Sequence, residues 1–219
     1  MANKIETILL DFDGTLFDTN DLIIETFMAV LGKHFPGRYS REDCLPFMGP
    51  PLRETFEALA PENVEQMMEE YVNWNLENHD RLTTEFPGVS DVLKKLKERG
   101  LKMAIVSTKR NKTIHRGLGL MDADGIFDIV IGLDDVTHAK PHPEPLQKAM
   151  DALGADPATT LMVGDNSHDI EGGRNAGTLT AGVAWSAKGR EFMESLKPDY
   201  MLDAIEDLLE IADGKVRAE

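Results

Sequence analysis

Apolar segments of strand length alternate with segments of helical periodicity along most of the chain. The strand-like segments are nearly continuous in hydrophobicity rather than alternating, which is typical of strands buried on both faces of a parallel sheet. We expect five such strands, at Ile5–Leu10, Leu101–Val106, Ile126–Ile131, Thr160–Val163 and Leu179–Ala184.

Helical segments separate these strands. Val89, Val92, Leu93 and Leu96 have the i, i+3, i+4, i+7 spacing of one helix face, with Ser90 as a candidate N-cap and Gly100 as a stop. Further helices are expected after Asn111, at Pro143–Leu153, at Ser167–Ala176 and around Ile205–Leu209. This alternation predicts an α/β fold with a Rossmann-like parallel sheet.

Residues 17–83 break the alternation. Ile23, Phe27, Val30 and Leu31 share one helix face, and the stretch from Val64 to Val72 forms another, with little that resembles a strand. We therefore expect an all-helical domain at 17–83, inserted into a core formed by residues 1–16 and 84–219.

The charge balance narrows the classes of function. The chain has 219 residues, with 23 Lys and Arg against 39 Asp and Glu, a net charge of −16. Such acidity disfavours nucleic acid and anionic membranes as partners. A single cysteine, Cys44, excludes a disulfide framework, and the longest apolar run, Phe27–Leu31, is too short to span a membrane. We expect a cytoplasmic protein, a monomer or a weak dimer, that acts on a small molecule.

The strongest chemical signal is Asp11-Phe12-Asp13-Gly14-Thr15 at the end of the first strand. Side chains two apart in a strand point the same way, and ligands of open α/β sheets bind beyond the carboxyl ends of the strands. Asp11 could act as a nucleophile on phosphorus and Asp13 as a general acid and base. A calcium loop is the alternative, but its glycine would come later and a helix would precede it. Two carboxylates beside a phosphate call for a divalent cation, and oxygen ligands suit Mg²⁺.

Three further strand ends carry polar residues. Asp165 and Asp169 follow the fourth strand and could complete and orient a metal site, although a simple helix cap is an equally good interpretation. Ser107 and Thr108 follow the second strand and could bind a phosphoryl oxygen. Lys140 follows the third strand and could neutralise the nucleophile and the phosphoryl group, unless it is a solvated loop lysine.

Two histidines flank this lysine. His138 and His142 do not form a His-x₃-His pattern on an expected helix. We therefore interpret them as loop residues and not as metal ligands.

These four elements, each at a strand end and in this order, resemble the haloacid dehalogenase superfamily, and the resemblance covers the whole chain. The helical insert is similar to the cap of its phosphoglycolate phosphatase-like subgroup. The resemblance implies that Asp11 is the nucleophile, that Asp13 is the general acid and base, and that Mg²⁺ is held by Asp11, Asp13 and Asp165. It also assigns phosphate binding to Ser107 and Lys140, while Thr108 stands where the family often has Asn.

Several other stretches are similar to the inorganic pyrophosphatases of this superfamily. They are Asn20–Ile24, Arg41–Pro50, Leu133–Thr137 and Ala181–Trp185. The resemblance implies Mg²⁺-dependent hydrolysis of pyrophosphate. This substrate would need cations around its leaving phosphate, and Arg53, Lys109 and Arg110 are the candidates. The alternatives are a phosphatase for phosphoglycolate or another small phosphate ester, a phosphomutase, and a phospho-accepting signalling domain; the last would lack the helical insert.

Overall fold

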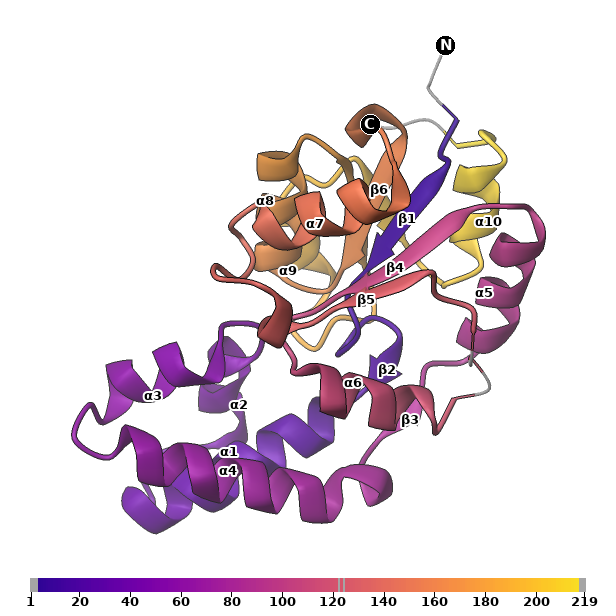
Figure 1. Cartoon of the computed structure of the whole chain (residues 1–219). Helices are drawn as coiled ribbons and strands as arrows, with labels where there is room; N and C mark the ends of the chain where they lie inside the picture. Colours follow the sequence, from indigo (N-terminus) through magenta and orange to yellow (C-terminus); the bar gives the residue numbers. More distant parts are fainter. Residues whose placement is uncertain (1–3, 122, 124, 217–219) are drawn as a thin grey trace. The chain divides into compact units, whose positions relative to one another are not determined.

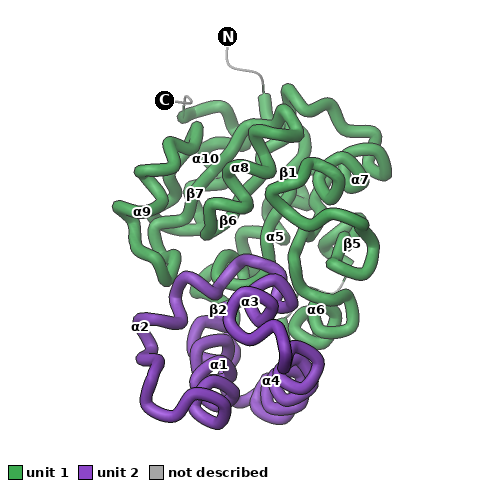
Figure 2. The backbone as a smooth tube through the Cα atoms, turned by 90° about the vertical axis from the view of Figure 1, so that its left-hand side faces the viewer, with its two compact units in different colours: residues 1–17, 85–219 green, residues 18–84 purple. Residues whose placement is uncertain are grey.

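A computed structural model of the protein describes residues 4–121, 123 and 125–216 (Figure 1). The chain forms two compact units (Figure 2). The larger contains residues 1–17 and 85–219, and the smaller contains residues 18–84. These limits lie one residue from the expected ones.

The larger unit is built on a parallel sheet whose strand order is β5-β4-β1-β6-β7-β8. The sheet is therefore centred on β1, with β4 and β6 as its neighbours, and Leu10 lies level with Ile105 and Val163. This is the expected Rossmann-like arrangement, in which crossover helices connect parallel strands. The strands are β1 (Thr7–Leu10), β4 (Lys102–Val106), β5 (Ile129–Ile131), β6 (Thr160–Gly164), β7 (Leu179–Val183) and β8 (Tyr200–Leu202).

Helices cover both faces of this sheet (Figure 1). Ile8 and Leu10 of β1 belong to one apolar cluster, whereas Leu9 between them belongs to the other. This alternation follows from the two-residue period of a strand, so each face has its own core. The helices of this unit are α5 (Val89–Glu98), α6 (Asn111–Leu118), α7 (Glu144–Leu153), α8 (Ser167–Ala176), α9 (Arg190–Ser195) and α10 (Asp207–Ala212).

Local sequence signals explain where most of these helices and strands begin and end. Some of the limits expected from the sequence were wrong. Helix α8 matches its expected limits because Asn166 caps its start and Gly177 ends it in the left-handed conformation. Helix α5 is capped by Gly88, at φ 81°, and not by Ser90, which lies inside the helix and donates a hydrogen bond to Glu85. Strand β5 is shorter than expected, and β8 and α9 were not expected.

The smaller unit is helical, as the sequence predicts. It contains α1 (Asn20–His34), α2 (Arg41–Cys44), α3 (Leu52–Leu59) and α4 (Val64–Asn78). An aromatic cluster packs its interior, where the ring of Phe27 lies 5.0–5.9 Å from the rings of Phe47, Phe56 and Tyr71. Two short strands, β2 (Phe17–Asp18) and β3 (Thr84–Glu85), pair where the chain passes between the units.

Within the described residues, no helix is both long enough and apolar enough to cross a membrane.

Candidate active site

The expected strand ends meet at the carboxyl edge of the sheet. Asp11 directly follows β1, Ser107 follows β4 and Asp165 follows β6, and these three strands are neighbours. Backbone bonds fix the exits, since the Asp11 N–H donates to Val163 at 2.9 Å and the Ser107 N–H donates to Ile131 at 3.0 Å. The fold therefore brings together residues that lie far apart in the sequence.

A buried lysine joins the parts of this site. The Lys140 Nζ atom donates to Asp11 Oδ1 at 3.0 Å, to Asp169 Oδ1 at 2.6 Å and to the carbonyl oxygen of Val106 at 2.7 Å. Lys140 is 3% exposed, which rejects the alternative of a solvated loop lysine. A buried ammonium with three acceptors is held in one position and keeps its charge.

The ionisation of these groups reflects burial and mutual charge. Burial raises the pKa of Asp11 to about 7. The positive charge of Lys140 opposes this increase, and the negative charge of Asp169 adds to it. Burial also raises the pKa of Asp165, and the charges of Asp169 and Asp11 add to it. Burial alone would lower the pKa of Lys140, but the charges of Asp11 and Asp169 outweigh it and the pKa is raised. The site holds more negative charge than its lysine can balance.

Asp169 performs two structural tasks. One oxygen pairs with Lys140, and the other accepts the Asn166 N–H at 3.0 Å in the capping box of α8. The carboxylate is 1% exposed. Asp169 thus orients Lys140 and fixes the loop that carries Asp165.

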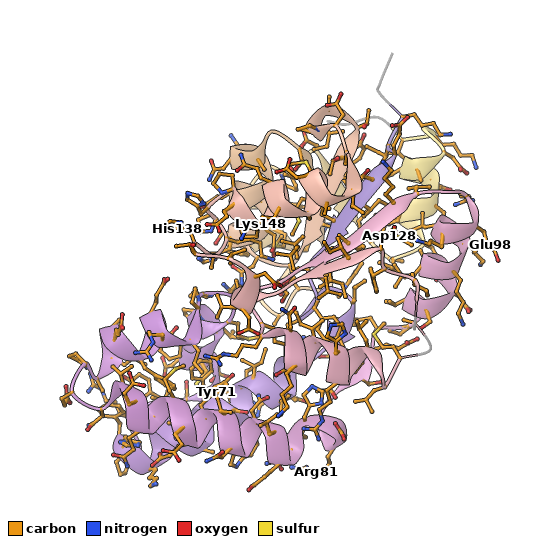
Figure 3. All side chains as sticks on the ribbon, in the orientation of Figure 1. Tyr71, Arg81, Glu98, Asp128, His138 and Lys148 are labelled. Atoms are coloured by element: carbon orange, nitrogen blue, oxygen red, sulfur yellow. The ribbon has the colours of Figure 1, made fainter. Side chains whose placement is uncertain are left out.

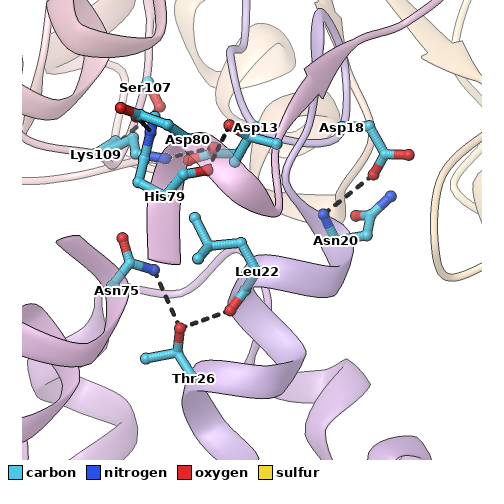
Figure 4. A network of polar contacts seen from close by, with 11 residues as sticks. Asp13, Asp18, Asn20, Leu22, Thr26, Asn75, His79, Asp80, Ser107 and Lys109 are labelled. Atoms are coloured by element: carbon cyan, nitrogen blue, oxygen red, sulfur yellow. Dashed lines mark hydrogen bonds and ion pairs between the residues drawn. The ribbon is translucent and has the colours of Figure 1, made fainter. Parts of the chain in front are cut away.

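Asp13 lies in a different environment from Asp11. It is partly exposed, and its Oδ1 accepts a hydrogen bond from Lys109 Nζ at 2.7 Å (Figure 4). Lys109 follows Ser107, whose Oγ accepts the Lys109 N–H at 3.3 Å. The loop after β4 therefore places a cation beside Asp13, whereas the sequence analysis considered Lys109 only as a cation for the leaving phosphate.

Two glycines permit the close packing of the carboxylates. Gly14 has φ +74°, and a Cβ there would lie 2.3 Å from Asp165 Oδ2. A Cβ at Gly164 would lie 2.2 Å from the Asp169 Cγ atom. Neither position has room for a side chain, because the backbone runs directly against the acidic groups.

The structure adds a cation that the sequence did not reveal. Lys188 Nζ lies 3.1 Å from Asn166 Oδ1, and its charge acts on Asp165. Burial lowers the pKa of Lys188, while the charges of Asp165 and Asp169 oppose that effect. Ser186 in the same loop donates to the Asp165 carbonyl oxygen at 2.7 Å. A lone lysine in a loop has no distinguishing sequence pattern, so only the fold identifies it.

The remaining candidates lie elsewhere or in ordinary settings. Thr108 is partly buried beside Ser107. Arg53 belongs to α3 of the smaller unit, where its guanidinium forms two hydrogen bonds with Glu65, at 2.7 and 3.1 Å. Arg110 is exposed, and its Nε lies 3.8 Å from Asp134. A role in substrate binding stays a prediction for all three.

The acidic residues could hold a metal ion. Asp11, Asp165 and Asp169 each place a carboxylate oxygen within 4.8 Å of the others, and all three are buried. The two Asp169 oxygens are bonded to Lys140 and to the Asn166 N–H, and both partners are themselves buried, so Asp11 and Asp165 are the better ligands. Buried carboxylates in excess of their cations suit a hard divalent ion.

Aspartates and a buried lysine at the carboxyl edge of an open parallel sheet are an arrangement suited to nucleophilic catalysis by a carboxylate. Residues 8–183 match the family model described as haloacid dehalogenase-like hydrolase. The chain belongs to this family of hydrolases.

Curated relatives cover nearly the whole chain. A protein named Pyrophosphatase PpaX from Anoxybacillus flavithermus is 54% identical over 208 residues, which is 95% of this chain and 97% of that protein. A protein of the same name from Bacillus cereus strain G9842 is 49% identical over 215 residues, covering 98% of this chain and all of that one.

Solved structures show the same fold. A haloacid dehalogenase-like hydrolase from Bacteroides fragilis is 31% identical, with a TM-score of 0.87, over 94% of this chain and all of that one. A predicted phosphoglycolate phosphatase from Haemophilus somnus is 22% identical, with a TM-score of 0.84, over 96% of this chain and 99% of that one. At that identity, the second similarity concerns the fold alone.

Proposed function

We propose that this protein is a cytoplasmic, Mg²⁺-dependent inorganic pyrophosphatase that works through an aspartyl-phosphate. The observation that carries the proposal is the 54% identity to a protein named pyrophosphatase, which extends over 95% of this chain. The larger unit would perform the chemistry, and the helical smaller unit would be the domain that selects the substrate.

The donor set fits the metal that the family implies. Asp11 and Asp165 would hold Mg²⁺ with carboxylate oxygens, and the Asp13 carbonyl oxygen would be a further ligand. The ion would neutralise charge on the phosphoryl oxygens. It would also favour the ionised form of Asp11, whose pKa burial raises to about 7.

In the first step, the ionised Asp11 would attack one phosphorus of pyrophosphate. A bond forms between the Asp11 oxygen and phosphorus, and the bond to the bridging oxygen breaks. Asp13 would give its proton to that oxygen as orthophosphate leaves. Lys140, held 3.0 Å from Asp11, would keep the nucleophile oriented and offset charge on the phosphoryl group.

In the second step, water would attack the phosphorus of the aspartyl-phosphate. Asp13, now ionised, would take a proton from this water, and cleavage of the phosphorus–oxygen bond would restore the Asp11 carboxylate. Ser107 would donate a hydrogen bond to the phosphoryl group in both steps. Lys109, whose Nζ donates to Asp13 Oδ1 at 2.7 Å, would orient that carboxyl group and bind the second phosphate.

The experiment is phosphate release from pyrophosphate, phosphoglycolate and an aryl phosphate, each with Mg²⁺ and after chelation. We expect kcat/KM to be highest for pyrophosphate and activity to disappear on chelation. Asp11→Asn is the control for contaminating phosphatase. A higher kcat/KM for phosphoglycolate than for pyrophosphate would contradict the proposed substrate. Full activity after chelation would contradict the metal requirement.

A further inference from the structure

A second cluster of metal-ligating side chains lies away from the acidic site. His138, His142 and Glu144 each place a ligand atom within 4.8 Å of the others. Both histidines are exposed, whereas the Glu144 side chain is 19% exposed. All three come from the segment that leads into α7, which belongs entirely to the larger unit, and His138 and Lys148 mark this region in Figure 3.

Hydrogen bonds hold the carboxylate of this cluster in place. Glu144 accepts the Thr137 N–H at 2.8 Å and the His138 N–H at 2.9 Å. These bonds lower the pKa of Glu144 to about 2. The two backbone hydrogen bonds therefore orient the carboxylate before any ligand arrives.

The two imidazoles are also close to each other. The ring centroids of His138 and His142 are 4.6 Å apart, with an interplanar angle of 32°. Pro141 and Pro143 stiffen the backbone around His142, and Asn175 donates to the Pro141 carbonyl oxygen at 2.8 Å. Lys140 anchors the middle of the segment in the interior. The three donors thus lie on a braced loop.

We propose that His138, His142 and Glu144 form a surface site for one divalent transition-metal ion of the zinc class. Two imidazole nitrogens and one carboxylate oxygen are a donor set that suits Zn²⁺ and Co²⁺ far better than Mg²⁺. Water would complete the coordination. The proposal replaces our interpretation of the two histidines as plain loop residues, which rested on the lack of helical spacing.

The present hydrogen bonds indicate what the ion must displace. His138 Nδ1 lies 3.1 Å from Glu144 Oε2, and His142 Nδ1 accepts the Glu144 N–H at 3.2 Å. An ion bound among these groups would take the place of the imidazole–carboxylate hydrogen bond and would require neutral rings. Lys148 Nζ, 3.4 Å from Glu144 Oε1, would repel the ion. Removing the Lys148 charge should therefore tighten binding.

The test is a titration of the full chain with Co²⁺ in the presence of excess Mg²⁺, which occupies sites made of oxygen ligands. Visible absorption reports Co²⁺ bound to imidazole, and Zn²⁺ should displace it. We expect His138→Ala and His142→Ala each to raise the Co²⁺ Kd by at least about tenfold. Lys148→Gln should lower it several-fold. His115→Ala, at an exposed histidine of α6, is the matched control and should leave the Co²⁺ Kd unchanged.

Nitrogen-15 spectra of the histidine rings provide the second measurement. Zn²⁺ should shift the resonances of His138 and His142 and leave that of His115 in place. Equal Co²⁺ affinity in the parent and the His138→Ala/His142→Ala double variant would overturn the proposal, as would the absence of an imidazole-type absorption band. All four substituted side chains are exposed, and circular dichroism would establish that each variant is folded.

Discussion

At the scale of single residues, the site depends on an ion pair in an unusual setting. Asp11 and Lys140 are 9% and 3% exposed, and removal of Lys140 would leave the Asp11 carboxylate buried without that cation. Lys140 has a second carboxylate, Asp169, at 2.6 Å. The two partners are therefore not equivalent, because the lysine keeps an ion pair when Asp11 is neutralised.

This asymmetry makes Asp11→Asn informative. We expect turnover of pyrophosphate to disappear, because an amide is a poor nucleophile of nearly the same shape. The melting temperature should stay the same or rise, since the change removes a buried charge that Asp169 and Asp13 repel. Steady-state rates and a thermal melt measure the two effects. Turnover near that of the parent would refute the role of Asp11.

Asp13→Asn tests the proton transfer. A general acid contributes about 10²–10⁴-fold, and its loss matters most for a leaving group that needs a proton. The variant should therefore lose more kcat on pyrophosphate than on an activated aryl phosphate. Lys109→Gln is a useful comparison, since it removes the partner of Asp13 and leaves the acid in place. Equal losses on both substrates would assign Asp13 to structure or metal binding alone.

At the scale of elements, strand ends and helix caps position the side chains of the candidate site. The β6–α8 connection places Asp165 between a strand and a helix cap, and Gly164 there has no room for a Cβ. A Cβ at Gly164 would collide with the buried Asp169 carboxylate. Asp169 accepts a hydrogen bond from Lys140, so the lack of a side chain at residue 164 helps to keep Lys140 in its orientation.

Gly164→Ala should therefore reduce both stability and activity. The added methyl would push Asp169 away from Lys140, at a cost of about 1–3 kcal/mol in the free energy of unfolding. Gly32→Ala is the control: a Cβ there meets nothing within 4 Å, and alanine favours the interior of α1. Urea unfolding and kcat/KM measure the two variants. A Gly164→Ala protein with the stability and activity of the parent would show that Asp169 relocates freely.

An ion-pair cluster joins α1 to α4 and predicts a pH dependence. Hydrogen bonds from Lys33, with smaller contributions from Gln66 and His34, outweigh burial and lower the pKa of Glu70 to about 2, from an ordinary value of 4.5. A carboxylate whose folded pKa is depressed stabilises the fold above its unfolded pKa, and this contribution is lost as the pH falls from about 4.5 towards 2.

Glu70→Gln should thus destabilise the protein at pH 7 by about 0.2–1 kcal/mol, the range typical of ion pairs at a protein surface. The difference in unfolding free energy between this variant and the parent should shrink as the pH is lowered through 4.5. Glu69→Gln removes the same charge at an exposed neighbouring residue, and it should leave the pH dependence of the urea midpoint unchanged. Urea midpoints across pH 3–7 test this, and a difference that is constant with pH would contradict the assignment.

Sequence patterns predicted the elements where local signals were strong. Helix α8 has both a cap and a terminal glycine, and its limits agree; β8 has only three residues and no periodicity, and it was missed. The residues that follow the strand ends were predicted because a parallel sheet gathers them at one edge. Lys188 could not be predicted, since its position beside Asn166 depends on a contact between separate loops.

At the scale of the whole molecule, the chain has two units with separate interiors. The larger unit has apolar clusters on both faces of its sheet, and the smaller has the aromatic cluster around Phe27. Phe27 is 1% exposed, and Leu93 of α5 is fully buried in the larger unit. Each unit therefore holds the apolar contacts that a cooperative folding unit needs.

We expect the two units to open separately under native conditions. Phe27→Ala removes a buried aromatic side chain, which costs about 3–5 kcal/mol of the local unfolding free energy. Amide hydrogen exchange should then accelerate in residues 18–84 and stay slow in the strands of the larger unit. Leu93→Ala should give the opposite pattern, with faster exchange in α5 and the adjacent sheet. Hydrogen exchange resolved by mass spectrometry separates these outcomes, and an equal acceleration throughout the chain in both variants would mean that the molecule unfolds as one cooperative body.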